Sequence, residues 1–141
     1  MKHLVKVILA SLVLSFTFSH AFAYENDLDQ AIAKAKANGK MAFIIFGREA
    51  CGNCQHLKKL IKEGAVNLRV NQYVIADINC DDRKQSDSFY KRYSVSGDYL
   101  PFVVITKPDG TMLVSRSGYG ETADYQKLIK EAEKKCSSKM K

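Results

Sequence analysis

Cys51 and Cys54 are the residues of this chain whose types and spacing point most directly to chemistry. They form the segment Cys51-Gly52-Asn53-Cys54, which follows a short apolar run and stands at the expected start of a helix. Residues three apart on a helix are neighbours, so the two sulfurs can form a disulfide and separate again without unfolding. A helix N-terminus offers free N–H groups and a partial positive charge, which favour a thiolate at Cys51. The pattern predicts thiol–disulfide exchange, with Cys51 as nucleophile and Cys54 as the resolving thiol.

A single Cys-x-x-Cys pair is also compatible with a zinc site or with a purely structural disulfide. Zinc ribbons need a second pair of Cys or His at short spacing, and His56, Cys80 and Cys136 do not form one. Covalent haem attachment needs His directly after the second Cys, where this chain has Gln55. We therefore expect no metal and no cofactor, while a metal-handling protein that uses this Cys pair and His56 stays open as an alternative.

The elements that position this pair follow from the spacing of apolar residues. Helices are predicted over residues 27–38, 51–63 and 86–93, with a last helix that Thr122 caps. Strands are predicted over residues 41–46, 73–79, 102–106 and 112–117, with a polar loop over residues 81–85. The first two strands suit a buried parallel pair, and Pro108-Asp109-Gly110 turns the last two into a hairpin. This order predicts one mixed α/β sheet with a C-terminal antiparallel hairpin and helices on both faces.

The first 23 residues match the pattern of a secretory signal peptide. Lys2 and Lys6 precede and enter an apolar run over residues 4–18, and Ala21-Phe22-Ala23 offers small residues to a signal peptidase. The run is short for a membrane span, which needs about 20 residues. We therefore predict a signal peptide over residues 1–23, cleavage near Ala23, and one domain over residues 24–141 that is periplasmic or secreted.

The formal net charge of +7 could favour acidic partners or anionic membrane surfaces. The Lys and Arg residues are, however, scattered along the predicted helices, and no basic stripe alternates with aromatic residues. A solvated basic face is the simpler interpretation, and we expect no nucleic-acid partner.

Three features together resemble the thioredoxin superfamily: the apolar strand at residues 43–46, the Cys pair at a helix start, and Leu100-Pro101-Phe102 before a hairpin. The resemblance covers nearly all of residues 24–135 and is closest to small exported thioredoxin-like proteins and to the thiol-transfer domain of DsbD-type reductases. It implies a thioredoxin-like fold and a thiol–disulfide oxidoreductase that acts on exported proteins. It also implies that Pro101 is cis and lies against the dithiol, and that a membrane-bound donor of the DsbD type supplies electrons to a reductase.

The chain departs from the family pattern at the position of a buried acid that thioredoxins carry six residues before the first Cys. That position is Ile45, so the usual proton acceptor is missing. Asp77, on the neighbouring predicted strand, falls where thioredoxins carry a buried Lys. Our hypothesis is that Asp77 supplies the acid–base function for Cys54. A solvated or N–H-bonded carboxylate at a strand edge is the alternative.

Two further thiols and several basic residues lie outside this assignment. Cys80 ends the second predicted strand at the edge of the sheet that carries the Cys pair, and it is either a third redox thiol or a small packed group. Cys136 lies on the apolar stripe of the last helix, about 21 Å from its start, whereas a disulfide needs Cα atoms within about 7 Å. We predict that Cys80 and Cys136 are not bonded to each other. The basic residues that flank the Cys pair, which could stabilise a thiolate or simply be solvated, are Arg48, His56, Lys58 and Lys59.

The direction of electron transfer does not follow from these residues. The core has little room for the large helical insert of DsbA-type oxidases, which favours a reductase or a disulfide-interchange protein. Tyr119, in the loop after the hairpin, either contacts substrate or covers the core. A non-enzymatic module that binds peptides in the groove around Pro101 remains the other alternative.

Overall fold

The computed structural model describes residues 23–138, so the predicted signal peptide lies outside the described residues except for Ala23. The elements, in chain order, are β1 (Tyr24–Glu25), α1 (Leu28–Asn38), β2 (Met41–Gly47), α2 (Gly52–Lys62), β3 (Tyr73–Asn79), α3 (Arg83–Arg92), β4 (Phe102–Thr106), β5 (Met112–Ser117) and α4 (Thr122–Ser138).

The strands form one mixed sheet in the order β1-β3-β2-β4-β5. β1, β3 and β2 run parallel, and β4 joins β2 and β5 through antiparallel pairing. The predicted parallel pair and C-terminal hairpin are therefore confirmed. The sequence interpretation missed β1, because a strand of two residues is too short to show a periodic pattern.

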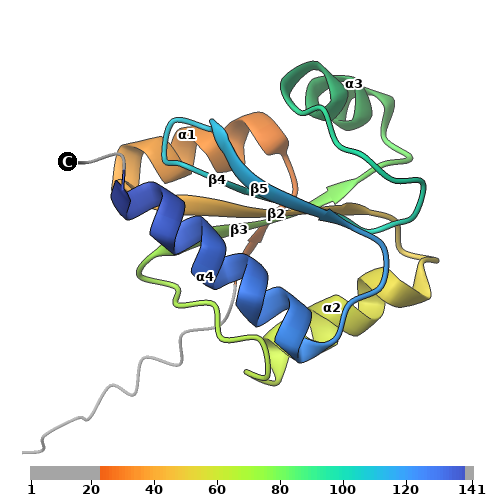
Figure 1. Ribbon diagram of the computed structural model, residues 1–141. Helices are drawn as coiled ribbons and strands as arrows, with labels where there is room; N and C mark the ends of the chain where they lie inside the picture. The colour runs from red at the N-terminus through yellow and green to blue at the C-terminus, as the bar shows by residue number, and fades with distance from the viewer. Residues whose placement is uncertain (1–22, 139–141) are drawn as a thin grey trace, which may run out of the picture.

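Helices cover both faces of the sheet, as predicted (Figure 1). Alternate residues of β2 point to opposite faces, which divides the core into two clusters. Phe43 and Ile45 pack in the cluster that α2 and α4 complete, whereas Ala42, Ile44 and Phe46 pack in the cluster beneath α1 and α3. Both faces of β2 are thus buried, which explains its continuous apolar run.

The start of α3 differs most from the prediction, and the other predicted helix boundaries agree within one residue. α3 begins at Arg83, because Asp82 accepts a hydrogen bond from the Gln85 N–H at 3.1 Å and caps the helix one turn earlier than predicted. Its first turn is polar and carries no apolar period, so residues 81–85 resembled a loop. Thr122 is the first residue of α4 and not its cap.

Candidate active site

Cys51 and Cys54, which we call the dithiol, lie where β2 ends and α2 begins. Cys51 is the N-cap of α2 with φ −85° and ψ 110°, and its Sγ accepts a hydrogen bond from the Cys54 N–H at 3.3 Å. The Cys51 side chain is partly exposed, whereas Cys54 is 2% exposed. The predicted geometry is therefore present, with one reachable sulfur at a helix N-terminus and a second sulfur buried one turn along.

Gly47, the last residue of β2, makes room for the dithiol. A Cβ placed on Gly47 would lie 2.5 Å from the Sγ of Cys54, well inside contact distance. The sequence interpretation ended this strand at residue 46 and missed the close approach. The position of a Gly at the end of an otherwise apolar strand was the available signal.

Pro101 lies at the same edge of the sheet as the dithiol. The Leu100–Pro101 peptide bond is cis, as the resemblance implies. Pro101 O accepts a hydrogen bond from the Gly118 N–H at 3.0 Å, and Asn53 Nδ2 donates to Leu100 O at 3.5 Å. The loop before β4 is thus connected to the dithiol helix on one side and to the end of β5 on the other.

The environment of Cys54 opposes its ionisation. Burial is the largest effect and, together with the neighbouring Cys51, raises the pKa of the Cys54 thiol to about 12. A hydrogen bond from the Arg48 backbone and the positive charge of Lys58 act in the other direction. Cys54 is therefore a protonated thiol at neutral pH while both cysteines are reduced.

Asp77 does not stand alone near the dithiol. Its carboxylate accepts a hydrogen bond from Lys58 Nζ at 2.9 Å, and the side chains of Lys58 and Asp77 are 18% and 28% exposed. No hydrogen bond joins Asp77 to Cys54 among residues 23–138, and the carboxylate is bonded to Lys58 instead. The sequence interpretation regarded Lys58 as one of several helix-surface cations, because its distance from β3 is set only by the packing of α2.

Cys80 lies at the dithiol end of the sheet, as predicted. Its N–H donates to Gly47 O at 2.7 Å, and its side chain lines a cavity of about 410 Å³ with Leu100 and Phe102. The Arg48 guanidinium, whose side chain is about half exposed, forms an ion pair with Asp81 at 3.2 Å. Contact with Cys80 is the main cause of the raised pKa of Arg48.

A group of polar side chains that the sequence interpretation did not connect lies between α2 and the start of α4. Tyr119 stacks on His56 with ring centroids 5.2 Å apart, and the Arg116 guanidinium lies 5.9 Å from the centre of the Tyr125 ring. Tyr125 is fully buried, and its hydroxyl has no hydrogen-bond partner within the described part of the chain. Burial raises the pKa of Tyr125 to about 12, so the phenol is neutral in the physiological pH range.

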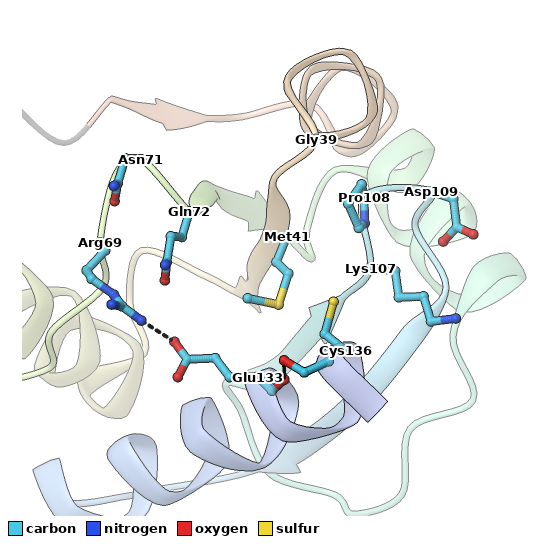
Figure 2. Close-up of a pocket in the computed structure, with 11 residues that line it drawn as sticks. Gly39, Met41, Arg69, Asn71, Gln72, Lys107, Pro108, Asp109, Glu133 and Cys136 are labelled. Carbon is cyan, nitrogen blue, oxygen red and sulfur yellow. Dashed lines mark hydrogen bonds and ion pairs between the residues drawn. The ribbon is translucent and has the colours of Figure 1, made fainter. Parts of the chain in front are cut away.

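Cys136 lies at the opposite end of the sheet, in the wall of a cavity of about 670 Å³. Figure 2 shows that Met41 and Cys136 turn their sulfur atoms toward the same space, beside the ion pair of Arg69 and Glu133. This cavity is separate from the dithiol, and Cys136 takes no part in the candidate active site.

The residues that the structure describes contain no group of three or more His, Cys, Asp or Glu side chains arranged to hold a metal ion. Within the same part of the chain, no helix is both long and apolar enough to cross a membrane.

A mixed sheet of this order, with a Cys-x-x-Cys helix start facing a cis-proline, defines a thioredoxin-like protein. The chain belongs to the thioredoxin-like domain family, which it matches over residues 28–133. No curated protein sequence matches it significantly.

Solved thioredoxin structures share the fold at low sequence identity. A mutant thioredoxin from Halobacterium salinarum NRC-1 has 19% identity and a TM-score of 0.58, over 77% of this chain and 88% of that one. Thioredoxin f from spinach chloroplast has 17% identity and a TM-score of 0.59, over 79% and 84%. A complex of ferredoxin:thioredoxin reductase and thioredoxin f2 contains a match with 19% identity and a TM-score of 0.62, over 78% and 94%. The likeness to DsbD-type reductases is not among these findings.

Proposed function

We propose that this protein is an exported thiol–disulfide oxidoreductase that reduces or rearranges disulfides in other exported proteins. One observation supports the proposal above all others. Cys51 is partly exposed at a helix N-terminus, and Cys54 is buried one turn behind it, at the edge of the sheet that carries Pro101. Membership of the thioredoxin-like family agrees with this chemistry.

The proposed reaction has two displacement steps. The Cys51 thiolate attacks one sulfur of a substrate disulfide, the substrate S–S bond breaks, and the departing substrate sulfur takes up a proton. This step leaves a mixed disulfide between Cys51 and the substrate. The Cys54 thiolate then attacks Cys51 Sγ, closes the Cys51–Cys54 disulfide and releases the second substrate thiol. Two electrons pass from the dithiol to the substrate.

Pro101 contributes to substrate binding in this proposal. Its carbonyl is already bonded to Gly118, so the loop before β4 is held rigidly beside the dithiol. A substrate segment that brings its disulfide to Cys51 passes along this loop, where Tyr99 is 73% exposed, and along the loop after β5, where Tyr119 is 49% exposed. These two side chains are the apolar surface that the incoming segment meets first.

Export and an electron supply complete the proposal. The pattern of residues 1–23 supports a cleaved signal peptide, and N-terminal sequencing of the exported protein is expected to begin at Tyr24. A reductase outside the cytoplasm needs electrons from the membrane, and we propose a donor of the DsbD type. A purified chain that starts at Met1 after export would contradict the first of these proposals.

Trapping of the mixed disulfide tests the exchange reaction. Cys54→Ser removes the resolving thiol, so the variant is expected to accumulate covalent complexes through Cys51 that reducing agents release. Cys51→Ser should form none, because the remaining thiol at position 54 is buried. Cys80→Ser is the matched control and should exchange disulfides as the unchanged protein does.

The same set of variants distinguishes the alternatives. A peptide-binding module would bind unfolded substrates without reducing insulin and without trapped complexes. A metal-handling protein would retain zinc or copper after purification under reducing conditions and lose it with Cys51→Ser. Measurement of the reduction potential of the Cys51–Cys54 couple against glutathione then separates a reductase from an oxidase, because about 30 mV changes the equilibrium constant about tenfold.

A further inference from the structure

Cys54 must ionise to complete the proposed exchange reaction, on which this inference rests, although it is almost fully buried. The neighbouring strand position that would carry an acid is Ile45, which is 0% exposed and packs in the apolar cluster of α2 and α4. Ile45 is paired in register with Asp77 on β3. The carboxylate beside this position therefore belongs to the adjacent strand, one strand further from the dithiol.

Lys58 connects this carboxylate to the dithiol helix. It follows Cys54 by four residues in α2, so the two side chains lie on the same side of the helix. Its ammonium group is 2.9 Å from Asp77 Oδ2 and 3.9 Å from Glu49 Oε2. The Glu49 side chain is 95% exposed, so Asp77 is the partner that holds Lys58 in place.

The charged and titratable groups around Lys58 favour its ammonium form. Burial lowers the pKa of Lys58, but the hydrogen bond and the charge of Asp77, together with the charges of Glu49 and Cys54, outweigh burial, and the net pKa is raised. Tyr24 on β1 faces the same pair, and burial together with the charge of Asp77 raises its pKa, so it is a neutral phenol. Tyr125 approaches Cys54 from α4 and is neutral as well. Lys58 is thus the positive side chain that acts on Cys54, and it keeps its proton during the reaction.

The opposing influence of Cys51 is temporary. While Cys51 is reduced, its hydrogen bond and its charge both raise the pKa of the Cys54 thiol. Once Cys51 has formed a mixed disulfide, it no longer carries charge, and the effect of Lys58 remains. Ionisation of Cys54 is then easier after the first step than before it.

We propose that Lys58, held by Asp77, stabilises the Cys54 thiolate in the second step of exchange. Resolution by Cys54 therefore becomes favourable only after Cys51 has attacked the substrate. Cys54 gives its proton to solvent, and the Lys58 ammonium stabilises the thiolate that remains. Its thiolate attacks Cys51 Sγ, the bond from Cys51 to the substrate sulfur breaks, and that sulfur leaves as a thiolate that takes up a proton. Asp77 is a positioning residue, because it acts through Lys58.

Single-turnover kinetics of Lys58→Met test this proposal. The substitution keeps the apolar stem and removes the charge. We expect resolution of the mixed disulfide to slow about tenfold at neutral pH, because loss of the Lys58 charge raises the pKa of the Cys54 thiol by about one unit. The pH profile of the resolution rate should move to higher pH by the same amount. Attack by Cys51 is measured separately as the rate of mixed-disulfide formation by acid quench and mass spectrometry, and it should not change.

Three variants complete the test. Lys59→Met, on the adjacent residue whose side chain is 70% exposed, should leave both steps unchanged. Lys58→Arg keeps the charge and should restore most of the rate. Asp77→Asn should slow resolution less than Lys58→Met and should add nothing in the Lys58→Met background, because the two residues act as one unit.

The outcomes separate this inference from the proposed function. Resolution by Lys58→Met at the unchanged rate from pH 6 to 9 would overturn the role of Lys58. Equal slowing of attack and resolution would overturn it too, since it would indicate a general defect. Additive effects of Asp77→Asn and Lys58→Met would overturn the pairing. Absence of exchange in the unchanged protein would instead overturn the proposed function.

Discussion

At the scale of single residues, the two cysteines of the dithiol have the same chemistry in different surroundings. Cys51 is partly exposed and accepts a backbone N–H, whereas burial holds the Cys54 thiol protonated with a pKa of about 12. The difference in surroundings arises because the two residues are one helical turn apart. Cys51 is partly exposed, whereas the Sγ of Cys54 lies against Gly47. These surroundings support the proposed division into an attacking and a resolving thiol.

Gly47→Ala tests how closely the dithiol is packed. The new methyl group would lie 2.5 Å from Cys54 Sγ, so the sulfur or the start of α2 must move. We expect a loss of about 1–3 kcal/mol in the free energy of unfolding, typical of overpacking, and slower resolution of mixed disulfides. Urea unfolding and single-turnover kinetics measure the two effects.

Gly52→Ala is the matched control for this substitution. Gly52 is the first residue of α2, and a Cβ added there meets no atom within 4 Å. The stability of the Gly52→Ala variant should stay the same or rise slightly, because Ala is a better helix former than Gly. Equal stability of both variants would show that Cys54 Sγ has more freedom than the contact implies.

At the scale of elements, a buried side chain joins the starts of α1 and α3. Gln85 is 7% exposed, its Oε1 accepts the Leu28 N–H at 2.8 Å, and its Nε2 donates to Asp27 at 2.8 Å. Asp27 is itself the N-cap of α1 and accepts the Gln30 N–H at 3.0 Å. One amide therefore satisfies a free N–H at the start of α1 and sets the position of α3 on this face of the sheet.

Gln85→Ala should destabilise the protein without affecting the dithiol. The change leaves the Leu28 N–H buried without a partner, which costs about 1–3 kcal/mol in the free energy of unfolding. Ser88→Ala, which removes an exposed hydrogen bond to Asp29 between the same two helices, should cost much less. Chemical denaturation measures both, and similar losses would contradict the role assigned to Gln85.

At the scale of the whole molecule, the sheet separates the cysteines into two groups. Cys51, Cys54 and Cys80 lie at the end where β2 and β3 finish, and all four cysteines are free thiols in the structure. Cys136 lines the cavity at Met41, where β2 starts. The strand between these ends has seven residues and spans about 20 Å, far beyond the reach of a disulfide.

Thiol mapping tests this separation. Mild oxidation of the reduced protein should link Cys51 to Cys54 and leave Cys80 and Cys136 free for alkylation. Mass spectrometry of peptides prepared without reduction measures the links. A peptide that joins Cys80 to Cys136 would contradict the fold, whereas a peptide that joins Cys51 to Cys80 would show that Cys80 takes part in exchange.

Local spacing in the sequence was enough to predict the order of the main elements, the mixed sheet and the dithiol at a helix start. It was enough because each of these rests on neighbours along the chain: an apolar run for a buried strand, and two Cys three residues apart on one turn. The first turn of α3 escaped prediction because its residues are polar and show no apolar period. The strand β1 escaped because it has only two residues.

Contacts between distant segments depended on the tertiary structure alone. The sequence placed Asp77 on the strand beside the dithiol, but only the packing of α2 against β3 showed that its partner is Lys58. The approach of α2 to the end of β2 makes Gly47 a contact of Cys54, and the packing of α4 against β5 brings Tyr125 beside Arg116. Spacing along the chain determines which residues share a turn or a strand face, whereas the distance between two elements is set by how side chains of both fill the space between them.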